Sequence, residues 1–238
     1  MKGAARLVVD RSGATEMYSE TPFAIRRSAD RFVVVGSAAA PVGGDELALS
    51  IEVGGGASAH VCTAAATMLW PAPTGTVAST MTTRLIVREN SHLSWLPEPS
   101  VSVAGSHHVA STSVSLATGA SCILIEEVAL GRHAEPPGFL DATLRIERNA
   151  AVLVHHAEQY GLGSAGWGNA VGTDGARHVL TAVIVGLCDA GAPRTEVGGL
   201  VSAAWLPVAH DAAVVLAVGP DRPSVLDRVR TIAPELKL

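Results

Sequence analysis

The 238-residue sequence has few aromatic side chains and few charges. Phe, Trp and Tyr together make up 4% of the chain, so a core must be built from Val, Leu, Ile and Ala. Charged residues make up 16% and hydrophobic residues 48%, which excludes a disordered chain. A weakly charged surface fits a protein that covers apolar surface with partners, although a composition rich in small residues explains the same values.

The sequence also lacks an excess of positive charge and a long apolar run. It carries 17 Lys and Arg against 22 Asp and Glu, which gives no electrostatic footprint for nucleic acid. The longest apolar run, residues 179–188, is too short to span a bilayer, and the N-terminal residues lack the apolar core of a signal peptide. We therefore expect a cytoplasmic protein with no nucleic-acid and no membrane partner.

Cysteine is scarce as well. Cys62, Cys122 and Cys188 are widely spaced, odd in number and form no Cys-x-x-Cys pair. This pattern indicates neither a disulfide framework nor a zinc site, and we expect three buried, reduced thiols.

What the sequence does contain is a series of short strand-like segments bounded by Gly, Pro, Asn and Ser, up to about residue 157. Tight turns at Gly56-Ala57, Ser91-His92, Gly119-Ala120 and Asn149-Ala150 follow one another at spacings of 35, 28 and 30 residues. Such a repeat indicates stacked β-coils, although hairpins of similar length in a sandwich would give the same spacing.

The C-terminal part has a different pattern. A glycine-rich loop at 161–175 precedes an apolar run at 179–187 that predicts a buried strand, and 212–218 predicts another. Trp205 lies at a predicted strand end or loop. Helical spacing predicts a helix over 224–236, capped by Asp221 or Ser224. We expect a single domain over 1–238, mainly β, with a β-helix-like or two-layer β architecture and a short C-terminal helix.

No motif for catalysis or tight metal binding is present. Residues 161–166 match the dinucleotide-binding fingerprint, but the glycines that follow prevent the helix that would hold a pyrophosphate. The pairs His107-His108 and His155-His156 would point to opposite faces of a strand, so they form no zinc site by themselves. No nucleophile elbow is recognisable. Glu126-Glu127 and Glu98 could serve as acid and base, but the sequence places no second carboxylate at a known distance from either. We expect no enzymatic activity and no tightly bound cofactor.

Three blocks, taken in order, resemble the urease accessory protein UreD (UreH) family. GGDELALSIEVGGGASAHVCTAAAT begins at Gly43, Gly44 and Asp45. HLSWLPEPSVSVAGSHH contains Trp95 and Pro97, and EEVALGRHAEPPGF contains Gly131 and Arg132. Together the blocks cover about residues 42–139, and their order makes the resemblance more specific than any one block. Cys62, Met68, Pro136 and Pro137 depart from the family pattern.

The resemblance implies a β-helix-like scaffold for nickel insertion into urease. Family members bind urease apoprotein on one side and UreF on the other, and UreF recruits the nickel-carrying GTPase UreG. Nickel is thought to pass through a tunnel in the UreD-like subunit, held only transiently. Carboxylates and hydroxyls suit such weak binding. The candidate tunnel or partner-binding residues are Asp45, Thr63, Glu98 and Glu126.

Structural roles compete with these functional ones, above all for Thr63 and Glu98. Gly131 and Arg132 are expected to shape a turn and to pair with a carboxylate. Two other protein classes stay open. A β-helical enzyme acting on polysaccharide would need clustered carboxylates and exposed aromatics, and a small metal-binding β-barrel would need a compact set of His and Glu ligands.

Overall fold

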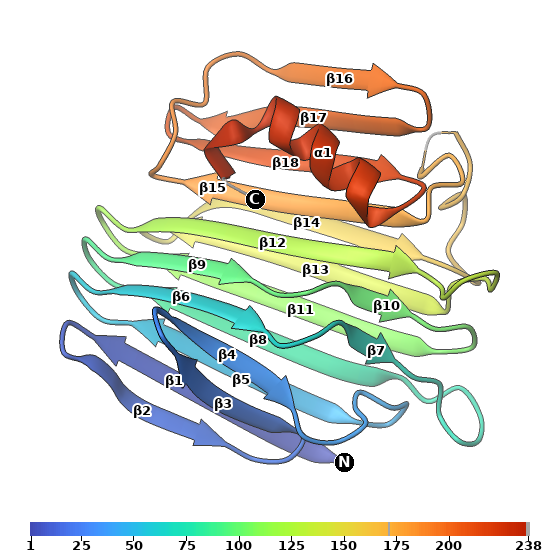
Figure 1. Cartoon of the computed structure of the whole chain (residues 1–238), viewed down its shortest axis with the longest axis horizontal. Coiled ribbons are helices and arrows are strands. Elements are labelled where there is room, and N and C mark those ends of the chain that lie inside the picture. Colours follow the sequence, from blue (N-terminus) through green and yellow to red (C-terminus); the bar gives the residue numbers. More distant parts are fainter. Residues whose placement is uncertain (171, 237–238) are drawn as a thin grey trace.

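The computed structural model describes residues 1–170 and 172–236. The chain forms two facing β-sheets, A and B, and one α-helix near the C-terminus (Figure 1). In Figure 1 the colours run in sequence order through the stack, with β1 to β4 at one end and β16 to β18 at the other. The mainly β fold with a short C-terminal helix is as predicted.

Sheet A has seven strands in the order β14-β13-β11-β8-β5-β1-β2. The five central strands run parallel to one another, and β2 and β14 add antiparallel edges. The strands of sheet A are β1 (Lys2–Asp10), β2 (Gly13–Ser19), β5 (Glu46–Val53), β8 (Ser79–Val87), β11 (His107–Leu116), β13 (Phe139–Arg148) and β14 (Ala151–Tyr160).

Sheet B runs in the order β16-β17-β18-β15-β12-β9-β6-β4-β3, and the short strands β7 and β10 attach beside β12. Strands β4, β6, β9 and β12 are parallel, and the strands beyond β12 are antiparallel. The strands of sheet B are β3 (Phe23–Ser28), β4 (Arg31–Gly36), β6 (Ser58–Thr63), β7 (Thr67–Leu69), β9 (His92–Leu96), β10 (Ser100–Ser102), β12 (Ser121–Leu130), β15 (His178–Val185), β16 (Arg194–Gly198), β17 (Val201–Ala209) and β18 (Ala212–Gly219).

The repeated turns confirm the stacked β-coils. From β4 to β13 the chain passes back and forth between sheets B and A, and the turns at His92 and Ser121 hydrogen-bond to the turn before them. The N–H of His92 donates to the Ala57 carbonyl at 3.0 Å, and the N–H of Ser121 donates to the Ser91 carbonyl at 2.9 Å. A sandwich of hairpins would have paired its strands antiparallel. The parallel pairing in both sheets therefore identifies a solenoid.

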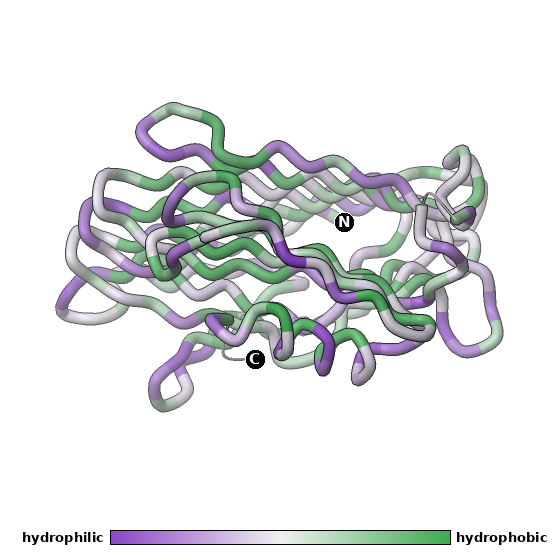
Figure 2. The backbone as a smooth tube through the Cα atoms, turned by 90° about the horizontal axis from the view of Figure 1, so that it is seen from above, coloured by the Kyte–Doolittle hydropathy of each residue, from purple (hydrophilic) through white to green (hydrophobic). Residues whose placement is uncertain are grey.

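Aliphatic side chains fill the space between the sheets, as the scarcity of aromatics predicts. One inward-facing row crosses five neighbouring strands of sheet A, and register places its members side by side: Leu7, Ile51, Leu85, Val114 and Ile146, each at most 1% exposed. A slip of one residue would turn such a row outward, so burial fixes the register. Figure 2 shows the two layers from above, with hydrophobic colour along the strands.

Helix α1 (Arg222–Ile232) lies on the outer face of sheet B and buries Val225, Val229 and Ile232. Its start agrees with the predicted cap, because an Asp221 Oδ1 atom accepts a hydrogen bond from the Ser224 N–H at 2.9 Å. The predicted helix over 224–236 is wrong at both ends. The helix begins two residues earlier, and it ends at Ile232 because Ala233 precedes a proline, which disfavours helical backbone. A short 3₁₀ turn, Pro234–Leu236, follows.

The prediction that Trp205 lies at a strand end or in a loop is wrong. Trp205 is in the middle of β17, has no exposed surface, and donates its Nε1–H to the Ala190 carbonyl at 2.7 Å. Pro207 suggested an end, but β17 continues past it to Ala209. A register irregularity between Pro207 and Ala209 accommodates the proline.

Two smaller expectations can be compared with the structure. Cys122 is buried, but Cys62 and Cys188 are only partly buried, so the expectation of three buried thiols is wrong for two of them. Residues 161–170 and 172–176 form bends and turns, so the glycine fingerprint is not followed there by a helix. Among the described residues, no helix has the length and apolarity needed to cross a membrane.

Candidate functional site

A cavity of about 420 Å³ lies between the two sheets. Sheet A contributes Leu49, Met81, Thr83 and Thr112 to its wall, and sheet B contributes Trp95 and Glu126. Most of this wall is apolar, so the few carboxyl and hydroxyl groups define where a polar or charged guest could be held.

Sheet B is interrupted beside this cavity. Strand β9 ends at Leu96 and β10 begins at Ser100, because Pro97 and Pro99 have no N–H to continue the ladder. In the same place β6 ends before β7 begins, so residues 64–66 lie outside any strand. Glu98 and residues 64–66 line the cavity and are also reached by solvent. The cavity therefore opens to the outside through this break, which we call the side opening.

Thr63 holds the side opening together. Its Oγ1 atom accepts a hydrogen bond from the Glu98 N–H at 2.8 Å and donates to the Ala65 carbonyl at 3.1 Å. One hydroxyl thus ties the two interrupted segments of sheet B to each other.

Replacing Thr63 with valine is expected to lower the free energy of unfolding by about 1 kcal/mol, because the Glu98 N–H loses its partner at an almost constant side-chain volume. Thr63→Ser keeps the hydroxyl and serves as the matched control. Urea denaturation of both variants measures the difference, and equal stability of the two would show that this hydrogen bond does not hold the opening.

Glu127, His178 and Arg222 form a buried ionic cluster on the outer side of the opening. His178 Nε2 lies 2.9 Å from Glu127 Oε2, and Arg222 contacts both carboxylate oxygens, with Nε at 2.8 Å and Nη2 at 3.0 Å. The side chains of Glu127 and His178 are each 4% exposed. Burial alone would raise the pKa of Glu127, but the hydrogen bonds from His178 and Arg222 together lower it below the usual value.

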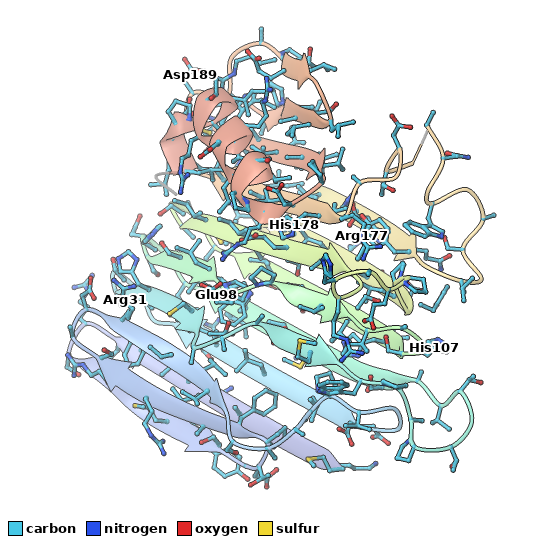
Figure 3. All side chains as sticks on the ribbon, turned by 45° about the vertical axis from the view of Figure 1, so that its right-hand side comes forward. Arg31, Glu98, His107, Arg177, His178 and Asp189 are labelled. Atoms are coloured by element: carbon cyan, nitrogen blue, oxygen red, sulfur yellow. The ribbon has the colours of Figure 1, made fainter. Side chains whose placement is uncertain are left out.

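Arg222 also reaches Glu98 at the side opening. Its Nη1 atom lies 2.8 Å from Glu98 Oε2, so one guanidinium joins helix α1 both to the side opening and to β12. Figure 3 shows Glu98 and His178 near the middle of sheet B, on the side where α1 lies. The ionic cluster therefore ties the start of helix α1, which packs on β15 to β18, to the side opening.

Glu126 points to the other side of β12, into the cavity. Loss of hydration at this partly exposed position, and to a smaller extent the nearby charge of Glu158, raise the pKa of its carboxyl, which lies at about 7. A hydrogen bond with Thr112 and the charge of His156 act in the opposite direction. Near neutral pH this carboxyl therefore exchanges between a neutral and an anionic form.

The structure brings three of the four predicted site residues to one cavity. Thr63, Glu98 and Glu126 all line it. Asp45 lies outside this lining, where its carboxylate accepts hydrogen bonds from the Val42 N–H at 2.8 Å and from the amino group of Met1. A role of Asp45 in nickel passage stays a prediction.

The predicted structural motif residues lie around the same cavity or in nearby turns. Trp95 and Pro97 line the cavity. Gly43 has no space for a side chain, because a Cβ would lie 2.6 Å from the Ala72 nitrogen, and Gly44 has a φ of +90°. Gly131 also has a positive φ of +83° at a turn. There Arg132 makes two 2.9 Å contacts to the Glu135 carboxylate, the kind of pairing that was expected.

The ionic cluster was missed because its members are remote in sequence. Arg222 is 95 residues from Glu127 and 124 residues from Glu98. Only the Glu126-Glu127 pair was visible, as two adjacent carboxylates on one strand. Strand alternation predicts that they face opposite sides of the sheet, but nothing local showed which of them meets Arg222.

Among the described residues, no group of three or more His, Cys, Asp and Glu side chains is arranged to hold a metal ion. The carboxylates near the cavity are instead separated from one another, at the opening and at its inner wall. This arrangement suits weak, sequential contact with a cation.

The comparisons with known proteins agree with one another. The chain matches the family model described as UreD urease accessory protein over residues 1–234. It is 35% identical over 208 residues to the urease accessory protein UreD of Streptomyces coelicolor, which covers 85% of this chain and 82% of the relative. It is 37% identical over 212 residues to the urease accessory protein UreD 3 of Streptomyces griseus, with the same coverage of 85% and 82%.

A third relative extends the similarity over almost the whole sequence. The urease accessory protein UreD of a Parafrankia strain is 31% identical over 260 aligned positions, which cover 98% of this chain and 87% of the relative. These matches span the solenoid, the side opening and the C-terminal helix, and they show that the chain belongs to the UreD family of urease accessory proteins.

Proposed function

We propose that this chain acts in the cytoplasm as a non-catalytic scaffold that is required for nickel insertion into urease apoprotein. It bridges urease to UreF and, through UreF, to UreG. Nickel crosses the chain through the cavity between the sheets and is bound only transiently.

The observation that supports this proposal is the cavity, which has one carboxylate at its opening and another on its inner wall. Glu98 stands at the side opening, where its side chain is 42% exposed, and Glu126 stands on the inner wall. A divalent cation entering from solvent meets a hydrated carboxylate first and a less hydrated one next. A small number of oxygen ligands binds such a cation weakly, so the cation can dissociate again.

The test is maturation of urease in cells that co-express its structural subunits with UreF and UreG, with this chain present or omitted, at limiting nickel. We expect omission to abolish most urease activity and to leave the enzyme poor in nickel. Affinity capture of the tagged chain should retain UreF and urease apoprotein. Equal activity and equal nickel content with and without the chain would contradict the proposal.

A further inference from the structure

A polar group of side chains lies beyond Glu126, on the inner faces of both sheets. We call Glu126, Thr112, Thr181, His156 and Glu158 the inner polar cluster. Strand register places them. Glu126 lies opposite Thr181 in the β12-β15 pair, and His156 of β14 aligns with Leu144 of β13, which aligns with Thr112 of β11. Polar groups on the inner faces are few, so their gathering here needs an explanation.

Thr181 supplies an independent sign that this cluster receives a ligand. Thr181 is 3% exposed, and its Oγ1 atom has no hydrogen-bond partner among the residues that the structure describes. Residues directly opposite each other in an antiparallel pair project from the same face, so this hydroxyl lies beside the Glu126 carboxyl. A buried hydroxyl without a partner is costly, and a transient guest would satisfy it.

His156 and Glu158 provide one imidazole and one carboxylate at the end of the cluster. Their Nε2 and Oε1 atoms are 2.7 Å apart. Two ligand atoms at this separation can occupy adjacent positions around a divalent cation at metal–ligand distances of about 2.1 Å. A cation that takes both atoms as ligands displaces the hydrogen-bonding proton to solvent, and the two side chains turn so that both lone pairs face the cation.

The position of β14 makes this pair accessible from outside the two sheets. β14 is the edge strand of sheet A, whereas sheet B continues past β12 with four more strands. The side chains of His156 and Glu158 are 28% and 20% exposed, so solvent reaches them. The pair thus lies at the margin of sheet A, whereas the side opening lies in sheet B between the ends of β6 and β9.

His156 and Glu158 lie behind the cavity wall, close enough to Glu126 for their charges to act on it. We propose that they receive the cation from Glu126 and form an exit position beyond the cavity, where an imidazole nitrogen makes the passage selective for a borderline cation such as Ni²⁺ over Mg²⁺. This inference rests on the proposed function. Oxygen ligands alone accept Mg²⁺ readily, whereas an imidazole favours Ni²⁺. The chain as a whole then has an entry that attracts any divalent cation and an exit that selects among them.

The test compares His156→Asn with His155→Asn in the full-length chain. His155 is the adjacent residue, points to the opposite face of β14 and is exposed, so it controls for loss of a histidine from the same strand. Isothermal titration with NiCl₂ alone, with and without excess MgCl₂, measures affinity. NMR of ¹⁵N-histidine-labelled chain follows paramagnetic broadening of each ring.

We expect Ni²⁺ to broaden the His156 signals at low occupancy, and His156→Asn to weaken nickel binding about tenfold, whereas His155→Asn changes it little. Excess Mg²⁺ should compete with Ni²⁺ in the His156→Asn chain but not in the wild type. Glu158→Gln keeps the histidine and should also weaken nickel binding. This second variant therefore tests the site even if His156→Asn misfolds.

Equal nickel affinity of the two histidine variants, without broadening at His156, would overturn the exit position. Urease maturation separates this failure from failure of the proposed function. If Glu126→Gln lowers the nickel content of urease and His156→Asn does not, only the exit position is wrong. If neither variant lowers it, passage through the cavity is wrong as well.

Discussion

Replacing Arg222 with alanine is expected to lower the free energy of unfolding by about 3 kcal/mol at neutral pH, because it leaves the Glu127 carboxylate buried without its main counter-charge. The Glu127 side chain is 4% exposed and receives two of the three Arg222 hydrogen bonds. The third bond, to the partly exposed Glu98, contributes little. Thermal or urea denaturation measures the loss.

Two variants of the same helix sharpen this prediction. Arg222→Lys keeps the charge but loses the paired hydrogen bonds, and it should cost less than the alanine variant. Arg228→Ala removes an arginine whose partner, Glu196, is 46% exposed, and it should cost about 0.5 kcal/mol. Similar losses for Arg222→Ala and Arg228→Ala would show that the buried ionic cluster does not hold α1 in place.

The pH dependence of the Arg222 effect has a definite sign. The pKa of Glu127 is lowered in the folded protein, so its ion pairs stabilise the fold above the unfolded pKa near 4.5, and this stabilisation is lost as the pH falls through the folded pKa. The difference between wild type and Arg222→Ala should therefore shrink below about pH 4.5. Stability curves from about pH 2 to pH 8 measure it.

Glu126→Gln is expected to stabilise the protein by about 2 kcal/mol at pH 8, although it removes a charged side chain. Burial raises the pKa of Glu126 from 4.5 to about 7. Above that pH the folded protein must keep a carboxylate in poorly hydrated surroundings. Glutamine fills the same space without a charge, and its amide can still hydrogen-bond with Thr112.

The pH dependence of stability that Glu126 causes has the opposite sign to that of most carboxylates, whose pKa is lowered on folding. Below about pH 4.5 Glu126 is neutral in both the folded and the unfolded chain and contributes nothing. Between 4.5 and 7 the unfolded chain ionises first, so wild-type stability falls with rising pH. The gain from Glu126→Gln should therefore grow over this range and level off above it. A constant gain at every pH would show that Glu126 is not buried as described.

A residue that destabilises its own fold at physiological pH is typical of a functional position. Glu127, its neighbour on β12, is the contrast, because Arg222 and His178 satisfy it. Two adjacent glutamates thus have different roles, and the face of the strand on which each lies decides which role.

Much of the fold could be predicted because it depends on local patterns. Alternating strands and four turns about 30 residues apart indicated stacked coils, and Asp221 marked the start of the helix. The sandwich alternative could not be excluded beforehand, because only the pairing partner of each strand decides between the two. The prediction for Trp205 was wrong for the same reason. Pro207, two residues later, indicated a strand end, and only the tertiary fold shows that Trp205 is buried in the middle of β17.

The candidate site was predictable only in part. Thr63, Glu98 and Glu126 came from the resemblance to a family rather than from any visible chemical motif, and they meet at one cavity. Arg222, His178 and Thr181 could not be found, because long-range strand order brings them to β12. For His155 and His156 the sequence indicated opposite faces, but pairing with β13 decides which one faces inward.

The nickel content of urease matured with the Glu126→Gln chain tests the central claim most directly. The control is Glu46→Gln, which changes a carboxylate with a 60% exposed side chain that pairs with the exposed Lys2. Passage through the cavity predicts nickel-poor urease with Glu126→Gln, normal urease with Glu46→Gln, and equal capture of UreF and urease by both chains. Urease with its full nickel content from the Glu126→Gln chain would contradict passage through the cavity.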